Sequence, residues 1–244
     1  MLFFKKKTIL KDLIPDNHID IHSHILFGID DGAKTFEDSL FLVKSLMSMG
    51  VSEIITTPHI IKHVWENTSE GILNRHNEVV RRLANENIHI PFRAAAEYLM
   101  DDEFVNLFKS QPLLTLKDNY VLVEMSYINA PIQLYDILFD LQVAGYKPVL
   151  AHPERYNFFH HNFNEYKKLK KAGCLFQLNL LSVMGYYGEL VAKTAQSLLS
   201  SGLIDFASSD AHHAKHIESF EGKVILKDIK PLKECINNTL FFKQ

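Results

Sequence analysis

The chain contains 244 residues, 47% of them hydrophobic, and its 26 basic and 29 acidic side chains give a formal net charge of −3. A chain of this length can bury a large core, as either one α/β barrel or two small domains. The slightly acidic balance argues against a nucleic-acid partner held by a basic surface. Only Cys174 and Cys235 are cysteines, too few for a disulfide framework, which favours a reducing compartment.

The N-terminal segment differs from a secretory signal. Leu2 to Phe4 precede Lys5 to Lys7, whereas a signal places its positive charge before a longer apolar run. No apolar run approaches the ~18 residues that span a bilayer, and no stretch is rich enough in Pro, Gly and Ser to act as a linker. We therefore expect a cytoplasmic protein without a transmembrane segment, with an N-terminal extension at residues 1–17 and a single domain at residues 18–244.

Short runs rich in Ile, Val and Phe predict seven β-strands, with helical patterns between them. The predicted strands cover residues 18–24, 53–58, 89–97, 119–124, 147–152, 174–180 and 204–209. The predicted helices cover residues 35–49, 69–87, 101–109, 132–144, 164–172 and 188–201. This alternation indicates parallel strands joined by crossover helices, in either an open doubly wound sheet or a closed barrel.

Polar residues at the strand ends favour the barrel. In an open sheet the ligand crevice draws on few strands, whereas in a barrel every strand can deliver a residue to one C-terminal face. Here nearly every predicted strand carries a His, Asp or Glu at or just beyond its C-terminal end. We therefore predict an α/β fold with a distorted, seven-stranded (β/α) barrel similar to a TIM barrel.

The first strand and the loop after it carry a candidate metal clip. Alternation along a strand places His22 and His24 on one face, where two imidazoles can bind a metal ion. The loop then offers Asp30 and Asp31 before Gly32, and such carboxylates suit divalent cations. Each motif alone is equally typical of surface residues and turns, so its weight depends on the other strand ends.

The remaining strand ends carry more groups that can bind metal. These groups are His59, Glu97, Glu124, His152, Asp210 and His212. A carboxylate at the end of an apolar strand is costly to bury unless it is paired or bound to metal. With His22, His24 and Asp31 they exceed the roughly four ligands of one zinc ion, so two or three ions are predicted. Clustered cations ~3.5 to 4 Å apart can clamp phosphoryl oxygens, which favours phosphoester hydrolysis.

Arg155 is the candidate phosphate-binding residue. It lies three residues beyond His152 and is the only arginine after Arg93. Its guanidinium offers a planar fork of donors that matches phosphate oxygens. The alternative interpretation is a salt bridge at the barrel rim with Glu154 or Glu165.

The other histidines and both cysteines are expected to take no part in the reaction. We expect most of the histidines at positions 18, 63, 76, 89, 160, 161, 213 and 216 to lie at the surface. Cys174 starts a predicted strand and Cys235 lies in a C-terminal helix. Because neither belongs to a phosphate-cradling loop, a cysteine-dependent phosphatase is disfavoured.

Together these motifs resemble those of bacterial tyrosine phosphatases in the polymerase and histidinol phosphatase (PHP) superfamily, the group associated with capsule and exopolysaccharide synthesis. The likeness spans most of the chain. It rests on Asp20-Ile-His22-Ser-His24, Asp30-Asp31-Gly32, Thr57-Pro58-His59, Ala96-Glu97-Tyr98, Val123-Glu124, the block from Ala151 to Tyr156, and Ser209-Asp210-Ala211-His212. The first block with its Asp-Asp-Gly, and the His-Pro-Glu-Arg-Tyr block, are more specific than membership of the superfamily requires.

The resemblance implies a PHP-type barrel with three divalent transition-metal ions, manganese in the first place and iron or zinc as alternatives. Glu97 would bridge two of them. The three ligand sets would be His22, His24, Glu97 and Asp210; then Glu97, Glu124 and His152; and then Asp31, His59 and His212. Arg155, Asp210 and His212 would act in catalysis, and Arg155 and Tyr156 would contact the substrate.

The activity implied by the resemblance is hydrolysis of phosphotyrosine on a protein, and the implied partner is a bacterial tyrosine kinase that controls polysaccharide export. One alternative is a PHP phosphatase that acts on a small ester such as histidinol phosphate. A more distant alternative is an inactive, metal-stabilised interaction protein.

The sequence departs from the family pattern in one respect. That pattern has further arginines near the second and last motifs, where they help to hold phosphate. The loops at residues 59–65 and 210–220 contain none. They offer Lys62, His63, His213, Lys215 and His216 instead.

Overall fold

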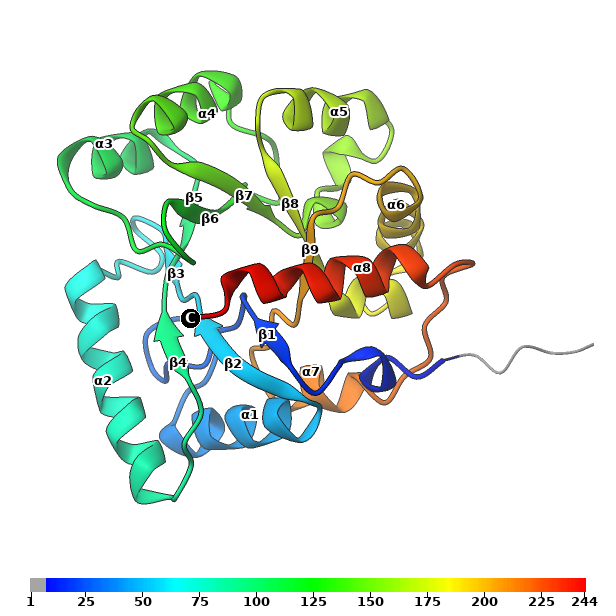
Figure 1. Ribbon diagram of the computed structural model, residues 1–244. Helices are drawn as coiled ribbons and strands as arrows, with labels where there is room; N and C mark the ends of the chain where they lie inside the picture. The colour runs from blue at the N-terminus through cyan, green and yellow to red at the C-terminus, as the bar shows by residue number, and fades with distance from the viewer. Residues whose placement is uncertain (1–7) are drawn as a thin grey trace, which may run out of the picture.

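The structure, a computed structural model, describes residues 8–244. Its strands are β1 (His18–Asp20), β2 (Val51–Thr56), β3 (His59–Ile60), β4 (Phe92–Ala94), β5 (Glu97–Leu99), β6 (Tyr120–Glu124), β7 (Lys147–Ala151), β8 (Leu175–Asn179) and β9 (Phe206–Ser208). All pairings between these strands are parallel, and α-helices lie outside them (Figure 1). The predicted α/β class with parallel strands is therefore confirmed.

The first six α-helices follow the predicted order, each beginning within two residues of its prediction, and two further helices come after them. They are α1 (Phe36–Ser48), α2 (Ser69–Asn85), α3 (Asp102–Ser110), α4 (Leu134–Val143), α5 (Phe163–Lys171), α6 (Glu189–Ser200), α7 (Ala214–Ser219) and α8 (Lys230–Asn238). Short 3-10 helices lie at Lys11–Leu13, Pro153–Arg155, Asn157–Phe159, Leu180–Met184 and Thr239–Phe242. Local capping helps to fix α1, because the Thr35 hydroxyl accepts from Asp38 N while the Asp38 carboxylate accepts from Thr35 N.

The strands form two sheets rather than the one continuous seven-stranded sheet that the sequence predicted. One has the order β1-β2-β4 and the other β3-β5-β6-β7-β8-β9. The predicted second strand, residues 53–58, corresponds to β2, and the separate strand β3 begins beyond it after Thr57 and Pro58. The predicted third strand, residues 89–97, is divided into β4 and β5 at Ala95 and Ala96. Pro58 has no amide hydrogen to donate to a neighbouring strand, which explains the break in the first of these ladders.

The segments that follow β1 and β9 connect the two sheets. His24 N donates to Ala211 O over 2.9 Å, and Asp210 N donates to His22 O over 2.8 Å. The buried Asp20 carboxylate accepts from both Ser208 and Ser209 nearby. These contacts place the ligand-bearing ends of β1 and β9 side by side.

Apolar side chains from both sheets meet in a small inner core. Its residues are Ile19, Ile21, Ile55, Ala95, Leu116, Leu122, Val149, Ala151, Phe206 and Phe242. Phe242 enters it from the 3-10 helix after α8, with its ring centroid 4.9 Å from that of Phe206. Arg93 fixes this helix by donating to Phe242 O and pairs with Glu53. The core is thereby closed at the end away from the ligand residues, where α8 crosses the strands (Figure 1).

Residues 8–17, which belong to the N-terminal extension predicted for residues 1–17, pack against the strands and helices. Leu10, Leu13 and Ile14 are buried in the main core. Leu10 N also donates to Gly222 O over 3.0 Å. The described part of the predicted extension is therefore held in place, because its apolar side chains find partners. Its first seven residues lie outside the described part of the chain.

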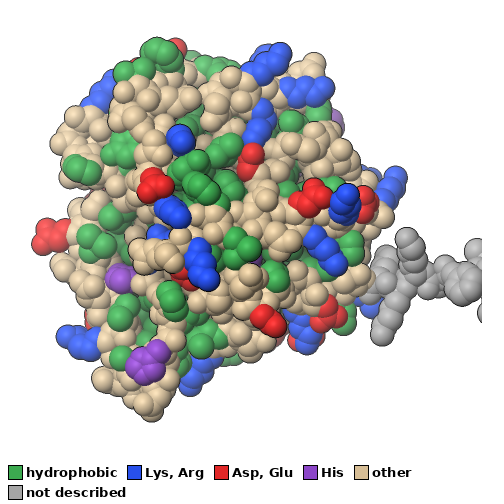
Figure 2. All heavy atoms as spheres, viewed as in Figure 1, with side chains coloured by type: hydrophobic (Ala, Val, Ile, Leu, Met, Phe, Trp, Pro, Cys, Tyr) green, Lys and Arg blue, Asp and Glu red, His purple; other side chains and the backbone are tan. Residues whose placement is uncertain are grey.

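Two observations bear on the expected partners. On the face that Figure 2 shows, acidic and basic side chains of the described residues are interspersed rather than gathered into a broad basic area. None of the helices within residues 8–244 combines the length and apolarity needed to cross a membrane.

Candidate metal centre

The structure brings all nine predicted ligand residues together, most of them at the C-terminal ends of strands, with His59 and Glu97 at the starts of the short strands β3 and β5 that follow β2 and β4. They form four overlapping groups in which the candidate ligand atoms lie within 4.8 Å of one another. The groups are His22, His24 and Asp210; His22, Glu97 and His152; His59, Glu97 and Glu124; and His24, Asp31, His59 and His212. Each strand contributes little alone, and the cluster exists because parallel strands point their ends to one side.

Two ligand residues have a backbone conformation that L-residues rarely adopt. His152, after β7, has φ 37°, and Asp210, after β9, has φ 50°. This left-handed conformation costs free energy at a residue with a Cβ, and such residues are concentrated at functional sites. The backbone turns sharply at His152 and at Asp210, where each side chain enters the cluster.

The ligand atoms of Glu97 and Asp210 that face His22 and His24 lie at distances from the two rings that suit a shared metal ion. His22 Nε2 lies 3.3 Å from His24 Nε2, 3.2 Å from Glu97 Oε2 and 3.2 Å from Asp210 Oδ1. His24 Nε2 lies 3.3 Å from Glu97 Oε2 and 3.5 Å from Asp210 Oδ1. Ligand atoms at ~2.0–2.1 Å from a tetrahedral ion are separated by about 3.3–3.4 Å. These residues therefore fit a divalent ion.

Outer hydrogen bonds orient the imidazole rings toward the cluster. His22 Nδ1 donates to Gln177 Oε1 over 2.7 Å, and His24 Nδ1 donates to Asp30 Oδ2 over 2.8 Å. Such partners fix the ring so that Nε2 is presented to a metal. Asp30 thus orients a ligand, whereas Asp31 belongs to the cluster. The sequence shows Gln177 as a polar residue within an otherwise apolar run, and the structure shows it fully buried, but its partner His22 could not be read from that pattern.

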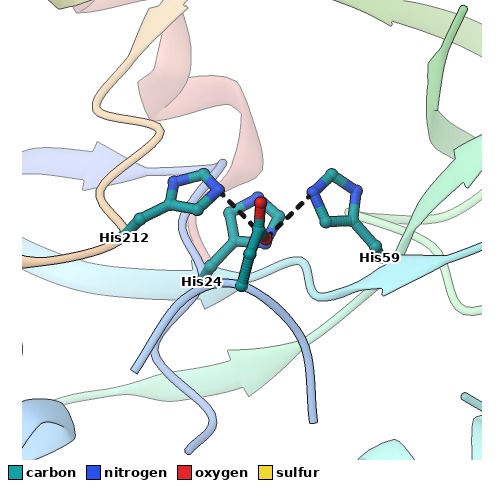
Figure 3. Close-up of side chains that lie close together, drawn as sticks. His24, His59 and His212 are labelled. Atoms are coloured by element: carbon teal, nitrogen blue, oxygen red, sulfur yellow. Dashed lines mark ion pairs between the residues drawn. The ribbon is translucent and has the colours of Figure 1, made fainter. Parts of the chain in front are cut away.

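The group that contains Asp31, from the loop after β1, also includes three histidines. Its carboxylate Oδ1 lies 3.4 Å from His59 Nε2 and 3.5 Å from His212 Nε2. Figure 3 shows His24, His59 and His212 around one carboxylate, with dashed lines for the ion pairs. The loop can pass this close only with glycine at position 32, because a Cβ there would lie 2.1 Å from His24 O.

Glu97 lies between the groups. Its Oε2 faces His22 and His24, while its Oε1 lies 3.0 Å from His152 Nε2. His59 Nδ1 lies 3.2 Å from Glu97 Oε2 and 2.9 Å from Glu124 Oε1. The two oxygens of one carboxylate thus face different sets of histidines, as a bridging ligand requires.

The charges in the cluster favour a cationic centre. Burial lowers the pKa of His22, but the facing carboxylates of Glu97 and Asp210 outweigh burial and raise it to about 10. Burial opposes ionisation of Glu97 and Asp210 as well, yet the histidines hold the pKa of each well below its usual range. Glu124 Oε1 and Asp210 Oδ1 make no hydrogen bond within residues 8–244, but they face His59 Nδ1 at 2.9 Å and His22 Nε2 at 3.2 Å. Buried carboxylate oxygens that face histidine nitrogens in this way suit divalent cations.

Arg155 lies beside this cluster rather than at the rim. Its Nη1 donates to Asp210 Oδ2 over 3.0 Å, and its side chain is 20% exposed. The alternative salt bridge with Glu154 or Glu165 is not formed. Glu154 is buried and accepts a hydrogen bond from Asn179 N. Glu165 accepts hydrogen bonds from Lys168 and Tyr135.

The predicted substrate contact of Tyr156 requires correction. Tyr156 is completely buried, its hydroxyl donates to Ala151 O, and it accepts from Met125 N. It supports the site from behind. The aromatic residues that do line the cavity are Tyr127 and Tyr187, which sequence patterns did not single out because isolated tyrosines in loops carry no periodic signal.

Several remaining histidines are also placed differently from the expected surface positions. His18 and His216 are buried. His213 and His216 line the cavity of about 270 Å³ that contains Arg155 and most of the cluster. Lys62 instead pairs with Glu103 over 2.7 Å. Histidines after β9, rather than Lys62, therefore occupy the space near Arg155.

We predict that Asp30→Ala weakens metal binding without removing a ligand. His24 would lose the acceptor of its Nδ1 proton, and loss of such an outer partner typically costs about 10- to 100-fold in metal affinity or activity. Competitive titration with a chromophoric chelator measures the change. Asp30→Asn, which keeps an acceptor oxygen, should lose less. Equal metal affinity in the wild type and Asp30→Ala would contradict the orienting role.

A family model described as capsular polysaccharide synthesis, CpsB/CapC, matches residues 18–219. The chain is 32% identical over 198 residues to the tyrosine-protein phosphatase YwqE of Bacillus subtilis, across 81% of this chain and 78% of that protein. It is 32% identical over 204 residues to the tyrosine-protein phosphatase CpsB of Streptococcus pneumoniae, across 80% and 83% of the two chains.

The chain is also similar in fold to solved structures. A crystal structure from work on YwqE of Bacillus subtilis and CpsB of Streptococcus pneumoniae, described as metal-dependent tyrosine phosphatases, has a TM-score of 0.77 and 31% identity, covering 83% of this chain and 84% of that one. Histidinol phosphate phosphatase from Lactococcus lactis has a TM-score of 0.51 at 12% identity, covering 83% and 90% of the two chains, and shows likeness of fold alone. The chain therefore belongs to the CpsB/CapC family of capsular polysaccharide synthesis.

Proposed function

We propose that this chain is a metal-dependent protein-tyrosine phosphatase and that the cavity beside Arg155 is its active site. The observation that carries the proposal is the convergence of nine metal-compatible side chains and one partly buried guanidinium, in a member of a family whose relatives are named tyrosine-protein phosphatases. Metal ions held by these side chains, together with the guanidinium, would provide the positive charge that suits the dianionic phosphoryl group of a phosphate monoester.

We propose three divalent transition-metal ions, with manganese in the first place and iron or zinc as alternatives. The ligand sets would be His22, His24, Glu97 and Asp210; Glu97, Glu124 and His152; and Asp31, His59 and His212. The atoms of the first and third sets lie at spacings that support this division, and Glu97 faces both the first and the second. When bound, such ions supply Lewis acidity toward a phosphoryl group.

Arg155 would bind the transferred phosphoryl group. Its guanidinium is already oriented at the cavity by Asp210, so little reorganisation is needed when substrate binds. Asp210 would act in catalysis by holding this guanidinium as well as by binding metal. His212 donates its Nδ1 proton to Asp210 O, which leaves Nε2 facing the cavity beside Asp31.

The positions of the cysteines support this chemistry. Burial raises the pKa of both the Cys174 and the Cys235 thiol to about 12, so neither forms a thiolate near neutral pH. Both side chains are buried: Cys174 directly precedes β8, and Cys235 lies in α8. A cysteinyl-phosphate intermediate is therefore disfavoured.

We further propose that the two sheets act as one distorted, seven-stranded barrel of the PHP type within a single catalytic domain at residues 18–244. The shared inner core and the backbone contacts between His24 and Ala211 support this arrangement. The substrate would be a phosphotyrosine-bearing bacterial tyrosine kinase; the family description supports the link to capsular polysaccharide synthesis. The cytoplasmic location expected from the sequence stays a prediction.

Metal analysis combined with a substrate comparison tests this proposal. We expect more than one transition-metal ion per chain, and loss of phosphotyrosyl-peptide hydrolysis after chelation with recovery on adding manganese. The ratio of kcat/KM for the phosphotyrosyl peptide to that for histidinol phosphate should exceed one. A ratio far below one would favour the small-ester alternative, and metal-loaded protein inactive on both would favour the interaction protein.

A further inference from the structure

Two tyrosine rings flank Arg155 inside the cavity. The guanidinium carbon of Arg155 lies 4.8 Å from the ring centroid of Tyr127, which follows β6, and 4.1 Å from that of Tyr187, which precedes α6. Both distances are within the range of cation–π contact. The proposed phosphate-binding group thus contacts two aromatic rings.

The two rings differ in how much of their surface is available. The Tyr187 hydroxyl accepts a hydrogen bond from Asn179 Nδ2, which ties that ring to β8. The Tyr127 ring is stacked on the ring of His152 at 5.7 Å and an interplanar angle of 25°, with Tyr156 behind at 5.8 Å. Tyr127 nevertheless remains 45% exposed, so it is a supported aromatic surface that is open to a ligand.

We propose that Tyr127 forms a subsite for the aromatic ring of the substrate, an inference that rests on the proposed tyrosine phosphatase function. In phosphotyrosine a single oxygen atom separates the ring from phosphorus. When Arg155 binds the phosphoryl group, the ring must therefore lie close to the surfaces next to Arg155. Tyr127 is the exposed one, and aromatic rings pack against each other in offset or edge-to-face arrangements.

An alternative role for Tyr127 is to donate its hydroxyl to a phosphoryl oxygen. That hydroxyl lies 3.4 Å from His152 Nε2, at the edge of the ligand cluster. The two roles make different demands. A ring subsite needs the aromatic face and discriminates between phenyl and methyl groups, whereas a hydroxyl contact needs the oxygen and treats all phosphoryl groups alike.

Binding of non-hydrolysable phosphonates to the metal-loaded protein separates these roles. Isothermal titration calorimetry would compare phenylphosphonate with methylphosphonate on the wild type, Tyr127→Ala and Tyr127→Phe. We expect Tyr127→Ala to weaken phenylphosphonate binding roughly three- to tenfold, as loss of one aromatic pair predicts, and to leave methylphosphonate binding unchanged. Tyr127→Phe should bind both like the wild type. The kcat/KM for phosphotyrosyl peptide should fall in parallel with the affinity for phenylphosphonate across these variants.

Tyr135→Ala provides a matched control. Tyr135 is 39% exposed on α4, but its hydroxyl donates to Glu165 and it does not line the cavity. This variant should bind both phosphonates like the wild type. Retained methylphosphonate binding by Tyr127→Ala also shows that this variant is folded and metal-loaded.

Three results would overturn the subsite. Equal weakening of both phosphonates in Tyr127→Ala and Tyr127→Phe would assign the effect to the hydroxyl. Unchanged phenylphosphonate binding in Tyr127→Ala, with wild-type peptide hydrolysis intact, would remove the subsite and leave the phosphatase function standing. Wild-type protein that binds neither phosphonate and hydrolyses no phosphotyrosyl peptide would remove both.

Discussion

Glu97→Gln is expected to lose metal from more than one group and nearly all phosphatase activity. Glu97 is completely buried and its two oxygens face His22 and His24 on one side and His152 on the other. Changing even an outer partner of a metal ligand typically costs about 10- to 100-fold, so loss of a carboxylate shared by two groups should cost more than roughly 10³-fold in kcat/KM. Glutamine keeps the shape, which limits the change to charge and ligand strength.

Elemental analysis and kinetics on the same preparation check this result. Glu53→Gln is the matched control, because Glu53 is also a buried strand carboxylate but pairs with Arg93 at the opposite end of the strands. It should keep full metal content. Wild-type metal content in Glu97→Gln would show that this carboxylate does not bridge ions.

Arg155→Ala should impair catalysis while metal content stays close to that of the wild type. Removing one donor that stabilises charge in the transition state costs about 10²- to 10³-fold in rate, or about 3–4 kcal/mol. Arg155→Lys should recover only part of this loss, since lysine restores charge but lacks the planar fork and the stacking on Tyr187.

Single-turnover kinetics on phosphotyrosyl peptide, with metal content measured in parallel, test the role of Arg155. Arg82→Ala is a suitable control, because the Arg82 guanidinium also lies over two aromatic rings, those of Phe27 and Phe36, but on the outer helix α2. It should be as active as the wild type. If Arg155→Ala retained wild-type kcat/KM, phosphate binding would have to be assigned to other groups, with His213 the next candidate in the cavity.

The ligand set could be predicted from sequence because it depends on few structural details. Side chains at the C-terminal ends of parallel strands converge whether a strand ends one residue earlier or later. The two sheets and the break at Pro58 therefore did not displace His59 from the cluster. Alternation within one strand was enough to place His22 and His24 together.

Residues that act through distant contacts could not be predicted in this way. The hydrogen bond from His22 to Gln177 joins positions 155 residues apart, and no local pattern encodes it. Tyr127 and Tyr187 likewise meet only across Arg155. Tyr156 was assigned to the substrate from its place in a motif, although the chain turns after His152 and carries it into the core.

Closure of the inner core by Phe242 has a consequence for biosynthesis. Thr239 Oγ1 lies 3.1 Å from His18 Nδ1, although 221 positions separate the two residues. At roughly 5–20 residues per second, a ribosome needs about ten to forty seconds to cover that distance. During this interval Ile19 and Ile21 on the nascent chain lack Phe242, the last residue of the inner core to be synthesised. Yield should therefore depend on protection of these apolar side chains from aggregation while the polypeptide is still growing.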